Sequence, residues 1–314
     1  MKNKILIITP VKHIAGLFNQ LKKIGIIKMY ENISNAQFTK LKDHYIAIFT
    51  NPNKSKIFLG KQNLKKLSKL KVICTASTGT NHIDLDYCKK KNIKIISIAK
   101  DKKVINRISS TAEHAFALTL SSIRNLIPAY LDVQSRNWDY EKFIGRQMNS
   151  LNIGIIGYGR LGKLFHRYCE AFKANVKIYD PFIKNSSKKF TSLKKLLKNS
   201  DLISLHIHAN NNNKFLNKSK LVLMKKSVII INTSRGEIID EKALVAFLKK
   251  NKKAKIATDV LSNEIKNKFS SILYKYSLKN KNQVLITPHI GGMTIEGQKI
   301  AYMHAAYKLS KFLK

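Results

Sequence analysis

Three polar side chains in the second half of the chain have the chemistry needed to reduce a carbonyl group. Arg235 carries a planar fork of N–H donors that can hold a carboxylate and polarise a neighbouring ketone. His289 can pass a proton to the developing alkoxide, and Glu264, if paired with it, would favour the charged imidazolium. The ordinary alternatives are a surface salt bridge for Arg235, a solvated loop charge for Glu264 and a capped core histidine for His289. We favour the catalytic interpretation because all three stand at or just beyond the ends of expected strands.

A glycine-rich turn is a candidate site for a dinucleotide. Gly157, Gly159 and Gly162 form the pattern G-x-G-x-x-G directly after a short apolar run at 153–156. That run predicts a buried strand, and the apolar residues after the glycines recur at helical spacing. In such a unit Gly157 permits the tight turn, Gly159 lets the backbone approach a pyrophosphate, and Gly162 lets helix and strand pack closely. The alternative is a purely structural glycine turn.

The residues beside this turn indicate which dinucleotide it binds. The expected helix begins near Arg160 and Leu161, so amides there face the phosphates at the positive end of the helix dipole. A second expected strand, at 176–179, ends in Asp180, where a dinucleotide site needs a carboxylate for the ribose hydroxyls. Because this carboxylate would repel a ribose phosphate, we predict NAD rather than NADP.

Short apolar strands alternate with helical segments along the whole chain, which predicts an α/β fold with parallel sheets covered on both faces. The first part has expected strands at 5–8, 26–29, 46–49, 72–75 and 93–98. The second part has them at 153–156, 176–179, 202–206, 228–231, 256–258 and 284–286. We therefore expect two doubly wound domains, with Arg235, Asp259 and His289 on the same rim as the glycine turn.

A second candidate binding loop follows the expected strand at 72–75. It contains Ser77, Thr78 and Gly79, small residues in a turn whose backbone amides can bind an anion. Asp84 stands where it can cap the next helix. On local grounds, a helix-capping turn explains this loop as well as an anion site does.

Two features between the halves are expected to be structural. A helix at 110–126 has largely apolar positions, and we expect it to bridge the two domains. Trp138 lies in the segment between that helix and the glycine turn. For this side chain we expect packing rather than catalysis.

Composition excludes several classes of function. The 314 residues include 59 Lys plus Arg and 18 Asp plus Glu, a net charge of +41, but the charge is mostly scattered lysine, so we expect no dedicated nucleic-acid binding. No apolar run approaches the roughly 20 residues of a membrane span, and the N-terminus predicts a strand rather than a signal peptide. Cys74, Cys88 and Cys169 lack metal-ligand spacing, which predicts reduced thiols in a cytoplasmic protein without a metal.

Taken together, these motifs resemble the D-isomer-specific 2-hydroxyacid dehydrogenases, the family of D-3-phosphoglycerate, glycerate and D-lactate dehydrogenases. The resemblance covers nearly the whole chain. It rests on segments 77–84, 111–114, 154–162 with Asp180, 232–236, 259–264 and 288–292. Several motifs in the same order are far more specific than any one of them.

The resemblance implies an arrangement of domains. It places a flavodoxin-like substrate domain at 1–103 with 294–314 and a Rossmann cofactor domain at 104–293, with a catalytic cleft between them. The last helix, after about Thr294, is expected to return to the N-terminal domain. The family forms dimers through the cofactor domain, so we expect a homodimer.

The resemblance also implies roles for individual residues. Arg235 corresponds to the family's substrate-binding arginine, Glu264 to the acid that pairs with histidine, and His289 to the general acid and base. The loop Ser77-Thr78-Gly79 corresponds to its carboxylate-binding loop. The further expected cofactor contacts are His206, Thr233, Gly291 and Asp259, the last beside the nicotinamide.

The implied reaction is NAD-dependent hydride transfer between a D-2-hydroxy acid and its 2-oxo acid. Substrates of phosphoglycerate dehydrogenases and of hydroxypyruvate or glyoxylate reductases remain alternatives, and Lys54 and Lys56 are candidate point charges for a phosphate. No regulatory domain is expected after the last helix. A different alternative is a non-catalytic NAD(H)-sensing protein, because the family also includes transcriptional co-repressors.

Overall fold

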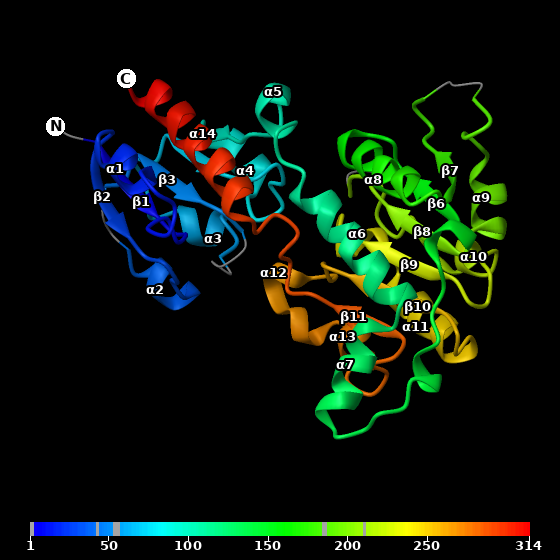
Figure 1. Cartoon of the computed structure of the whole chain (residues 1–314). Coiled ribbons are helices and arrows are strands. Elements are labelled where there is room, and N and C mark those ends of the chain that lie inside the picture. The colour runs from blue at the N-terminus through cyan, green and yellow to red at the C-terminus, as the bar shows by residue number, and fades with distance from the viewer. Residues whose placement is uncertain (1–2, 42–43, 53–56, 184–186, 210–211) are drawn as a thin grey trace. The chain divides into compact units, whose positions relative to one another are not determined.

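The computed structural model describes residues 3–41, 44–52, 57–183, 187–209 and 212–314. The chain divides into two compact units (Figure 1). Unit 1 is Met1–Ile108 with Met293–Lys314, and unit 2 is Ser109–Gly292. Each unit is built on one parallel sheet with helices on both faces. The predicted fold class of two doubly wound α/β domains is therefore confirmed.

Unit 1 contains a five-stranded sheet in the flavodoxin-like order β2-β1-β3-β4-β5. The strands are β1 (Lys4–Ile7), β2 (Ile26–Met29), β3 (Ala47–Thr50), β4 (Val72–Thr75) and β5 (Lys94–Ile96). The helices are α1 (Leu17–Lys22), α2 (Asn35–Thr39), α3 (Lys61–Leu64), α4 (Leu85–Lys90), α5 (Lys102–Ile105) and α14 (Ile295–Leu313). Along β1, Ile5 and Ile7 pack into one core cluster and Leu6 into the other, so both faces are buried.

Unit 2 contains a six-stranded sheet in the order β11-β10-β9-β8-β6-β7. The strands are β6 (Asn152–Ile156), β7 (Asn175–Tyr179), β8 (Leu202–Leu205), β9 (Ile229–Asn232), β10 (Lys255–Thr258) and β11 (Val284–Ile286). A parallel bridge joins Ile178 of β7 to Phe190 on the side away from β6. It takes the place of the third strand in the common Rossmann order 3-2-1-4-5-6, so this sheet is a Rossmann sheet with that strand reduced to one bridge.

Helices bury both faces of the second sheet. They are α6 (Ser110–Ile123), α7 (Leu126–Gln134), α8 (Arg160–Ala171), α9 (Leu193–Asn199), α10 (Lys218–Leu221), α11 (Glu241–Lys250), α12 (Glu264–Asn267) and α13 (Ile272–Ser277). Residues of α6 and α8 pack on one face, and residues of α9 and α11 pack on the other. No helix in the described ranges has the length and hydropathy needed to cross a membrane.

The predicted strands all occur, with ends displaced by one or two residues at most. Asp84 caps α4 as predicted, because its side chain accepts the amide of Tyr87 at 2.9 Å. The helix expected at 110–126 ends earlier, at Ile123. Asn125 follows in the left-handed conformation (φ 52°) and begins the separate helix α7. A short polar side chain tolerates that conformation, which explains the break.

The packing role expected for Trp138 is wrong for this chain taken alone. Its side chain is 88% exposed, and the neighbouring Tyr140 and Ile144 are 78% and 76% exposed. Apolar character made burial the natural expectation, but no core element of the described chain covers this segment. The three cysteines, which we expected to be reduced thiols, are buried and form no disulfide.

Candidate active site

The glycine turn after β6 has the geometry that its pattern predicts. Gly157 has φ +92°, and a Cβ there would lie 2.5 Å from the carbonyl oxygen of His206. A Cβ at Gly162 would lie 2.1 Å from the carbonyl oxygen of Gly157. Both positions therefore exclude any side chain, since real Cβ atoms do not approach backbone atoms so closely.

Gly159 differs from its two neighbours because open space surrounds it. A Cβ there would meet no atom within 4 Å, and Gly159 is the N-cap of α8, which has no side-chain cap. The backbone is thus open to a ligand where Arg160 and Leu161 start the helix. An uncapped helix N-terminus with a bare backbone fits the pyrophosphate of a dinucleotide.

Asp180 lies directly after β7 and against the glycine turn. Its Oδ2 accepts the amide of Tyr158 at 2.8 Å, and its Oδ1 accepts the amide of Phe182 at 2.9 Å. A carboxylate has about four acceptor positions, so lone pairs remain for ribose hydroxyls. The carboxylate is therefore held in register with the turn by the backbone on both sides.

His206 comes directly after β8 and lies against the glycine turn, since a Cβ at Gly162 would be 3.5 Å from the Cβ of His206. Its imidazole ring is neutral. Its Nε2 lies 2.9 Å from the hydroxyl of Ser204, and the ring centroid is 5.0 Å from that of Phe165. Burial lowers the pKa of His206 to about 4. Nδ1 is buried without a hydrogen-bond partner in the described residues. An orphaned polar atom beside the glycine turn also fits a polar cofactor.

The turn after β9 carries Arg235. The side chain of Asn232 closes this turn, since it accepts the amide of Ser234 and donates to the carbonyl of Arg235, both at 3.0 Å. Thr233 is buried within the turn. The Arg235 guanidinium donates to the carbonyl of Ser234 at 2.6 Å, and no described carboxylate lies within ion-pair distance.

Burial is the largest influence on Arg235 and lowers its pKa, with Glu237 and Glu264 acting in the opposite direction. Arginine remains charged under all ordinary conditions. The result is a partly buried cation without a bonded counter-ion in the described chain. Such a group attracts an anionic ligand.

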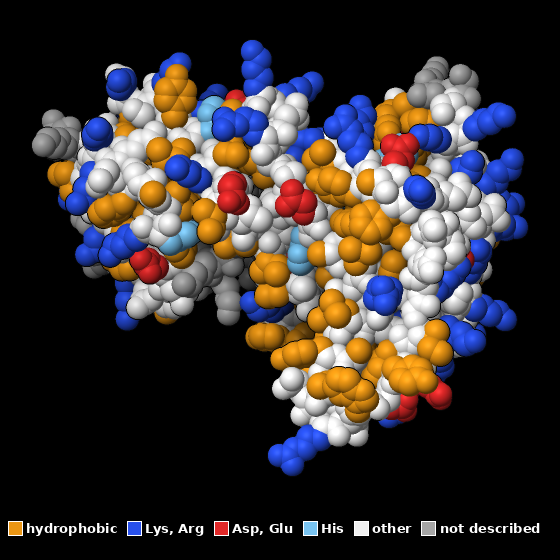
Figure 2. All heavy atoms as spheres, in the orientation of Figure 1, with side chains coloured by type: hydrophobic (Ala, Val, Ile, Leu, Met, Phe, Trp, Pro, Cys, Tyr) orange, Lys and Arg blue, Asp and Glu red, His pale blue; other side chains and the backbone are white. Residues whose placement is uncertain are grey.

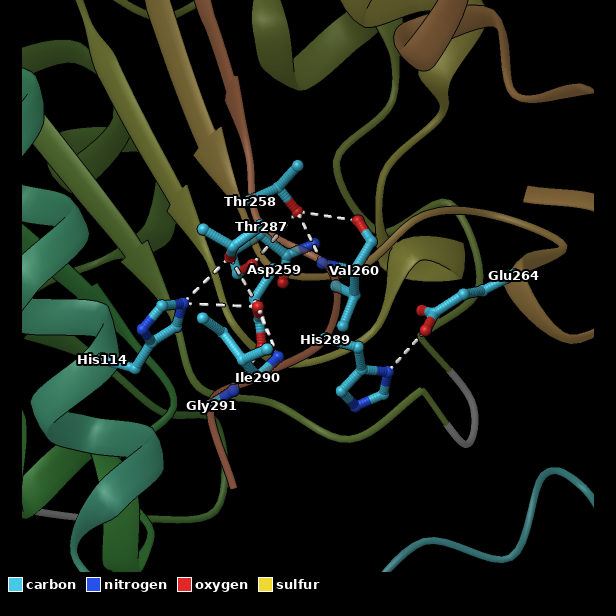
Figure 3. Close-up of polar contacts among 10 residues, drawn as sticks. His114, Thr258, Asp259, Val260, Glu264, Thr287, His289, Ile290 and Gly291 are labelled. Atoms are coloured by element: carbon cyan, nitrogen blue, oxygen red, sulfur yellow. Dashed lines mark hydrogen bonds and ion pairs between the residues drawn. The ribbon is translucent and has the colours of Figure 1, made fainter. Parts of the chain in front are cut away.

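Glu264, the first residue of α12, meets His289, which lies in the turn after β11 (Figure 3). Nδ1 of His289 is 2.7 Å from Oε1 of Glu264, and each side chain is 28% exposed. His289 itself has φ 58°, a left-handed conformation that is uncommon for a residue other than glycine. Its amide donates to the carbonyl of Thr287 at 3.0 Å.

The carboxylate of Asp259 holds this strained turn in place. Oδ1 accepts the amide of Ile290 at 2.8 Å, and Oδ2 accepts the amide of Gly291 at 2.7 Å. The Thr287 hydroxyl donates to Oδ1 at 2.5 Å (Figure 3). A Cβ at Gly291 would lie 3.0 Å from Oδ2, so glycine suits the close approach. The turn that carries His289 is thus wrapped around one buried carboxylate.

His114, from the first turns of α6, completes this network. Its Nε2 lies 2.9 Å from Oγ1 of Thr287 and 3.3 Å from Oδ1 of Asp259. The Thr287 hydroxyl gives its only hydrogen to Asp259, so His114 is the donor to both. Burial alone would raise the pKa of Asp259, but hydrogen bonds from His114, Thr287 and the two amides outweigh it and lower the pKa.

The structure therefore brings most of the predicted residues into one unit. Unit 2 contains the glycine turn and the other expected cofactor contacts, as well as Arg235, Glu264 and His289. Sequence analysis assigned no role to His114 or Thr287, although segment 111–114 was one of the motifs behind the resemblance. A histidine in the first turns of a helix gives no signal of its own that it bonds to a distant aspartate.

Ser77, Thr78 and Gly79 belong to unit 1, where they form the loop after β4. The hydroxyl of Ser77 donates to the carbonyl of Gly79 at 2.5 Å and lies 2.9 Å from Oγ1 of Thr75. Lys54 and Lys56 lie outside the described residues. Among the residues that are described, no group of three or more His, Cys, Asp or Glu could hold a metal ion.

The chain matches one family model and several known relatives. The family model of the D-isomer specific 2-hydroxyacid dehydrogenase, NAD binding domain, matches residues 116–291. D-3-phosphoglycerate dehydrogenase of Methanocaldococcus jannaschii is 30% identical over 319 residues, covering 99% of this chain and 57% of that protein. Hydroxypyruvate reductase of Thermotoga maritima is 29% identical over 252 residues, covering 78% of each chain.

A solved structure matches over almost the whole length. The crystal structure of D-lactate dehydrogenase from Aquifex aeolicus, complexed with NAD and lactic acid, has a TM-score of 0.81 and 30% sequence identity. The match covers 99% of this chain and 95% of that one. The chain spans about half the length of the phosphoglycerate dehydrogenases that it matches, at 57%, 46% and 54% of three of them.

Proposed function

The chain belongs to the D-isomer specific 2-hydroxyacid dehydrogenase family, and from this premise we propose that it is an NAD-dependent oxidoreductase that interconverts a D-2-hydroxy acid and its 2-oxo acid. The observation that carries the proposal is the His289–Glu264 pair at 2.7 Å, in the same unit as Arg235 and the glycine turn. The NAD-binding domain of the family, matched over residues 116–291, is the part of the chain that holds all of them.

Arg235 binds the acid in this account. Its guanidinium is partly buried and has no bonded carboxylate in the described chain, so a substrate carboxylate would supply the missing anion. A planar fork can bind two oxygens at once, which orients the neighbouring ketone as well as holding the acid. The bound cofactor supplies or takes the hydride.

His289 handles the proton. Because Nδ1 is engaged by Glu264, Nε2 is the ring nitrogen left to meet the substrate oxygen. In the direction of reduction it donates a proton to the developing alkoxide, and in the reverse direction it accepts the hydroxyl proton. Glu264 fixes the orientation of the ring through its contact with Nδ1.

Unit 1 is proposed to supply the remaining part of the substrate site. The loop of Ser77, Thr78 and Gly79 lies at the carboxyl end of β4, the position at which open α/β sheets bind ligands. Its backbone amides are proposed to bind the substrate carboxylate. The names of the relatives favour a 3-phospho-hydroxy acid, hydroxypyruvate or another small 2-oxo acid as the substrate.

Turnover assays test this function. The purified chain is given NADH with pyruvate, glyoxylate, hydroxypyruvate and 2-oxoglutarate, and NAD with 3-phosphoglycerate. The proposal predicts oxidation of NADH with at least one 2-oxo acid, or reduction of NAD with the phosphoglycerate. NADH binding without turnover of any of them would instead favour the NAD(H)-sensing alternative, which predicts a partner retained only in the presence of NADH.

An exposed apolar patch on unit 2 supports a homodimer. Helix α7 has no buried residue, and Tyr130 and Val133 are 59% and 47% exposed. Together with the exposed Trp138, Tyr140 and Ile144, they form the α7 patch, and Figure 2 shows hydrophobic side chains gathered over this region. Monomers rarely expose so many large apolar side chains on one segment. A second copy of the chain is the proposed occupant.

Light scattering coupled to size exclusion tests the dimer. The unsubstituted chain is expected to elute with the mass of two copies, and Trp138→Glu with Tyr140→Glu to elute as a monomer. Val222→Glu is the matched control, since Val222 is 66% exposed on α10's C-terminal end, outside the patch. A monomeric unsubstituted chain would contradict the proposal.

The buried thiols support a cytoplasmic location, which we also propose. None of the three cysteines, Cys74, Cys88 and Cys169, is in a disulfide. Burial raises the pKa of each thiol, to about 11 for Cys88. Free, protonated thiols are typical of proteins kept in a reducing compartment.

The lysine and arginine side chains are spread over the face seen in Figure 2 rather than gathered in one patch, which disfavours a dedicated nucleic-acid surface.

A further inference from the structure

Glu241 is a buried carboxylate whose partners all lie on the segment that carries Glu264. It is the first residue of α11 and only 9% exposed. Its Oε1 accepts the amide of Ser262 at 2.9 Å. Its Oε2 accepts the hydroxyl of Ser271 at 2.7 Å and the amide of Leu273 at 3.4 Å. The carboxylate is thus satisfied by neutral donors, and no described cation is within ion-pair distance of it.

These hydrogen bonds bracket Glu264. Ser262 precedes it by two residues, and Ser271 follows it after α12 and a short 3-10 turn at Lys268–Ser270. Asn263, directly before Glu264, has φ 58°. Helix α12 has only four residues, Glu264–Asn267, which is too short to be stable by itself. The position of Glu264 therefore depends on what anchors the two ends of its segment.

The same segment also touches the turn of Arg235. A Cβ at Gly236 would lie 2.0 Å from the carbonyl carbon of Leu261 and 2.3 Å from the amide nitrogen of Ser262. The chain then passes through a 3-10 turn at Gly236–Ile238 and reaches Glu241. The Arg235 turn and the Glu264 segment are consequently held together twice, by a bare backbone contact at Gly236 and by the carboxylate of Glu241.

We propose that Glu241 is a positioning residue that fixes segment 262–273, so that Glu264 stays within hydrogen-bond distance of His289. The inference rests on the proposed function of the His289–Glu264 pair. Glu241 itself touches neither the histidine nor any reacting atom. Its effect is transmitted through the backbone of Ser262 and the hydroxyl of Ser271.

Hydrogen exchange tests the mechanical part of the proposal without any need for turnover. Glu241→Gln keeps the size of the side chain but presents an NH₂ group to donors that need an acceptor. Peptides covering 262–273 are expected to exchange their amide hydrogens about 10-fold faster in this variant. Glu296→Gln is the control, because Glu296 is an exposed glutamate in the first turn of α14. Unchanged exchange at 262–273 in Glu241→Gln would overturn the proposal.

A double-mutant cycle tests whether Glu241 acts through Glu264. Glu241→Gln is expected to lower kcat about 10-fold, with the KM for NADH within about 2-fold of the parent. In a Glu264→Ala background the same change is expected to lower kcat by less than about 2-fold, because nothing remains to be positioned. An equal loss in both backgrounds would mean a general structural role and overturn the positioning claim.

Ser271→Ala provides a second, milder variant if Glu241→Gln fails to fold. It removes one donor to Oε2 and leaves Glu241 in place, so both readouts are expected to move in the same direction by a smaller factor. An effect on kcat that persists without Glu264 would again contradict positioning. If the parent turns over no acid, the proposed function fails, and the exchange at 262–273 alone decides whether Glu241 holds this segment.

Discussion

Nδ1 of His289 lies 2.7 Å from Oε1 of Glu264, although 25 residues separate them in the sequence. This contact determines which ring nitrogen is available, because Nδ1 faces the carboxylate and Nε2 is left for a ligand. Two other carboxylates keep the contact in place. Asp259 holds the turn on the histidine side, and Glu241 holds the segment on the glutamate side. The proposed catalytic pair, which joins the start of α12 to the turn after β11, is therefore supported by buried hydrogen-bond acceptors.

Gly159 and Gly162 form a matched pair for testing the cofactor site. Gly162→Ala is expected to destabilise the fold by roughly 1–3 kcal/mol, because its Cβ would lie 2.1 Å from the carbonyl of Gly157. Gly159→Ala meets no atom within 4 Å, so stability should change by less than about 0.5 kcal/mol. NADH affinity, measured by fluorescence, should nevertheless fall about 10-fold or more, since the methyl group occupies the pyrophosphate approach. Undiminished affinity would place the pyrophosphate elsewhere.

Asp180 is expected to set the preference for NADH over NADPH. Asp180→Ala removes the charge that repels a ribose phosphate, so the ratio of the two kcat/KM values should shift toward NADPH by about 10-fold or more. The variant also loses the acceptor of the Tyr158 amide, so a lower overall activity is expected. A preference that does not move would assign cofactor selection to other residues.

His206 makes stability depend on pH. Its folded pKa of about 4 lies below the unfolded value of about 6.5, so the unfolded chain binds the proton more readily between these values. The stabilisation from the neutral ring is present above pH 6.5 and is lost as pH falls, by about 2 kcal/mol at pH 5. Urea unfolding at pH 7.5 and pH 5 measures this loss, which should shrink in His206→Gln. An equal loss in both proteins would exclude His206 as its source.

Asp259→Asn is expected to loosen the turn that carries His289. The amide nitrogen that replaces one oxygen cannot accept from Ile290 or Gly291, and a buried unsatisfied amide costs roughly 1–3 kcal/mol. Since the folded pKa of Asp259 is lowered, its stabilisation exists above the unfolded pKa and disappears as pH falls below about 4. The free energy of unfolding of Asp259→Asn should therefore fall less steeply with decreasing pH than that of the parent. His114→Gln should show a smaller change of the same kind.

The sequence carried enough information for the framework of the fold and for the choice of candidate site residues. Buried parallel strands are short apolar runs, and the glycine turn has a fixed spacing, so both are local patterns. Arg235, Glu264 and His289 stand near strand ends, where topology alone brings side chains to one rim of a sheet.

The residues that support them left no such pattern. Glu241 begins a helix, where an acidic residue is ordinary, and only the folded chain reveals that it accepts from Ser262 and Ser271. The bonds of His114 to Thr287 and Asp259 span more than 100 residues of sequence. The prediction for Trp138 was wrong for a different reason. Hydrophobicity predicts that a side chain is buried, but it does not say whether the covering surface belongs to the same chain.

The most direct test of the account compares the parent with His289→Ala in steady-state turnover on the best 2-oxo acid, with NADH affinity measured separately. Loss of a general acid is expected to lower kcat by about 100- to 10,000-fold while the Kd for NADH stays within about 2-fold. That result would assign the proton transfer to His289. A variant that keeps kcat within about 10-fold of the parent would contradict the central claim.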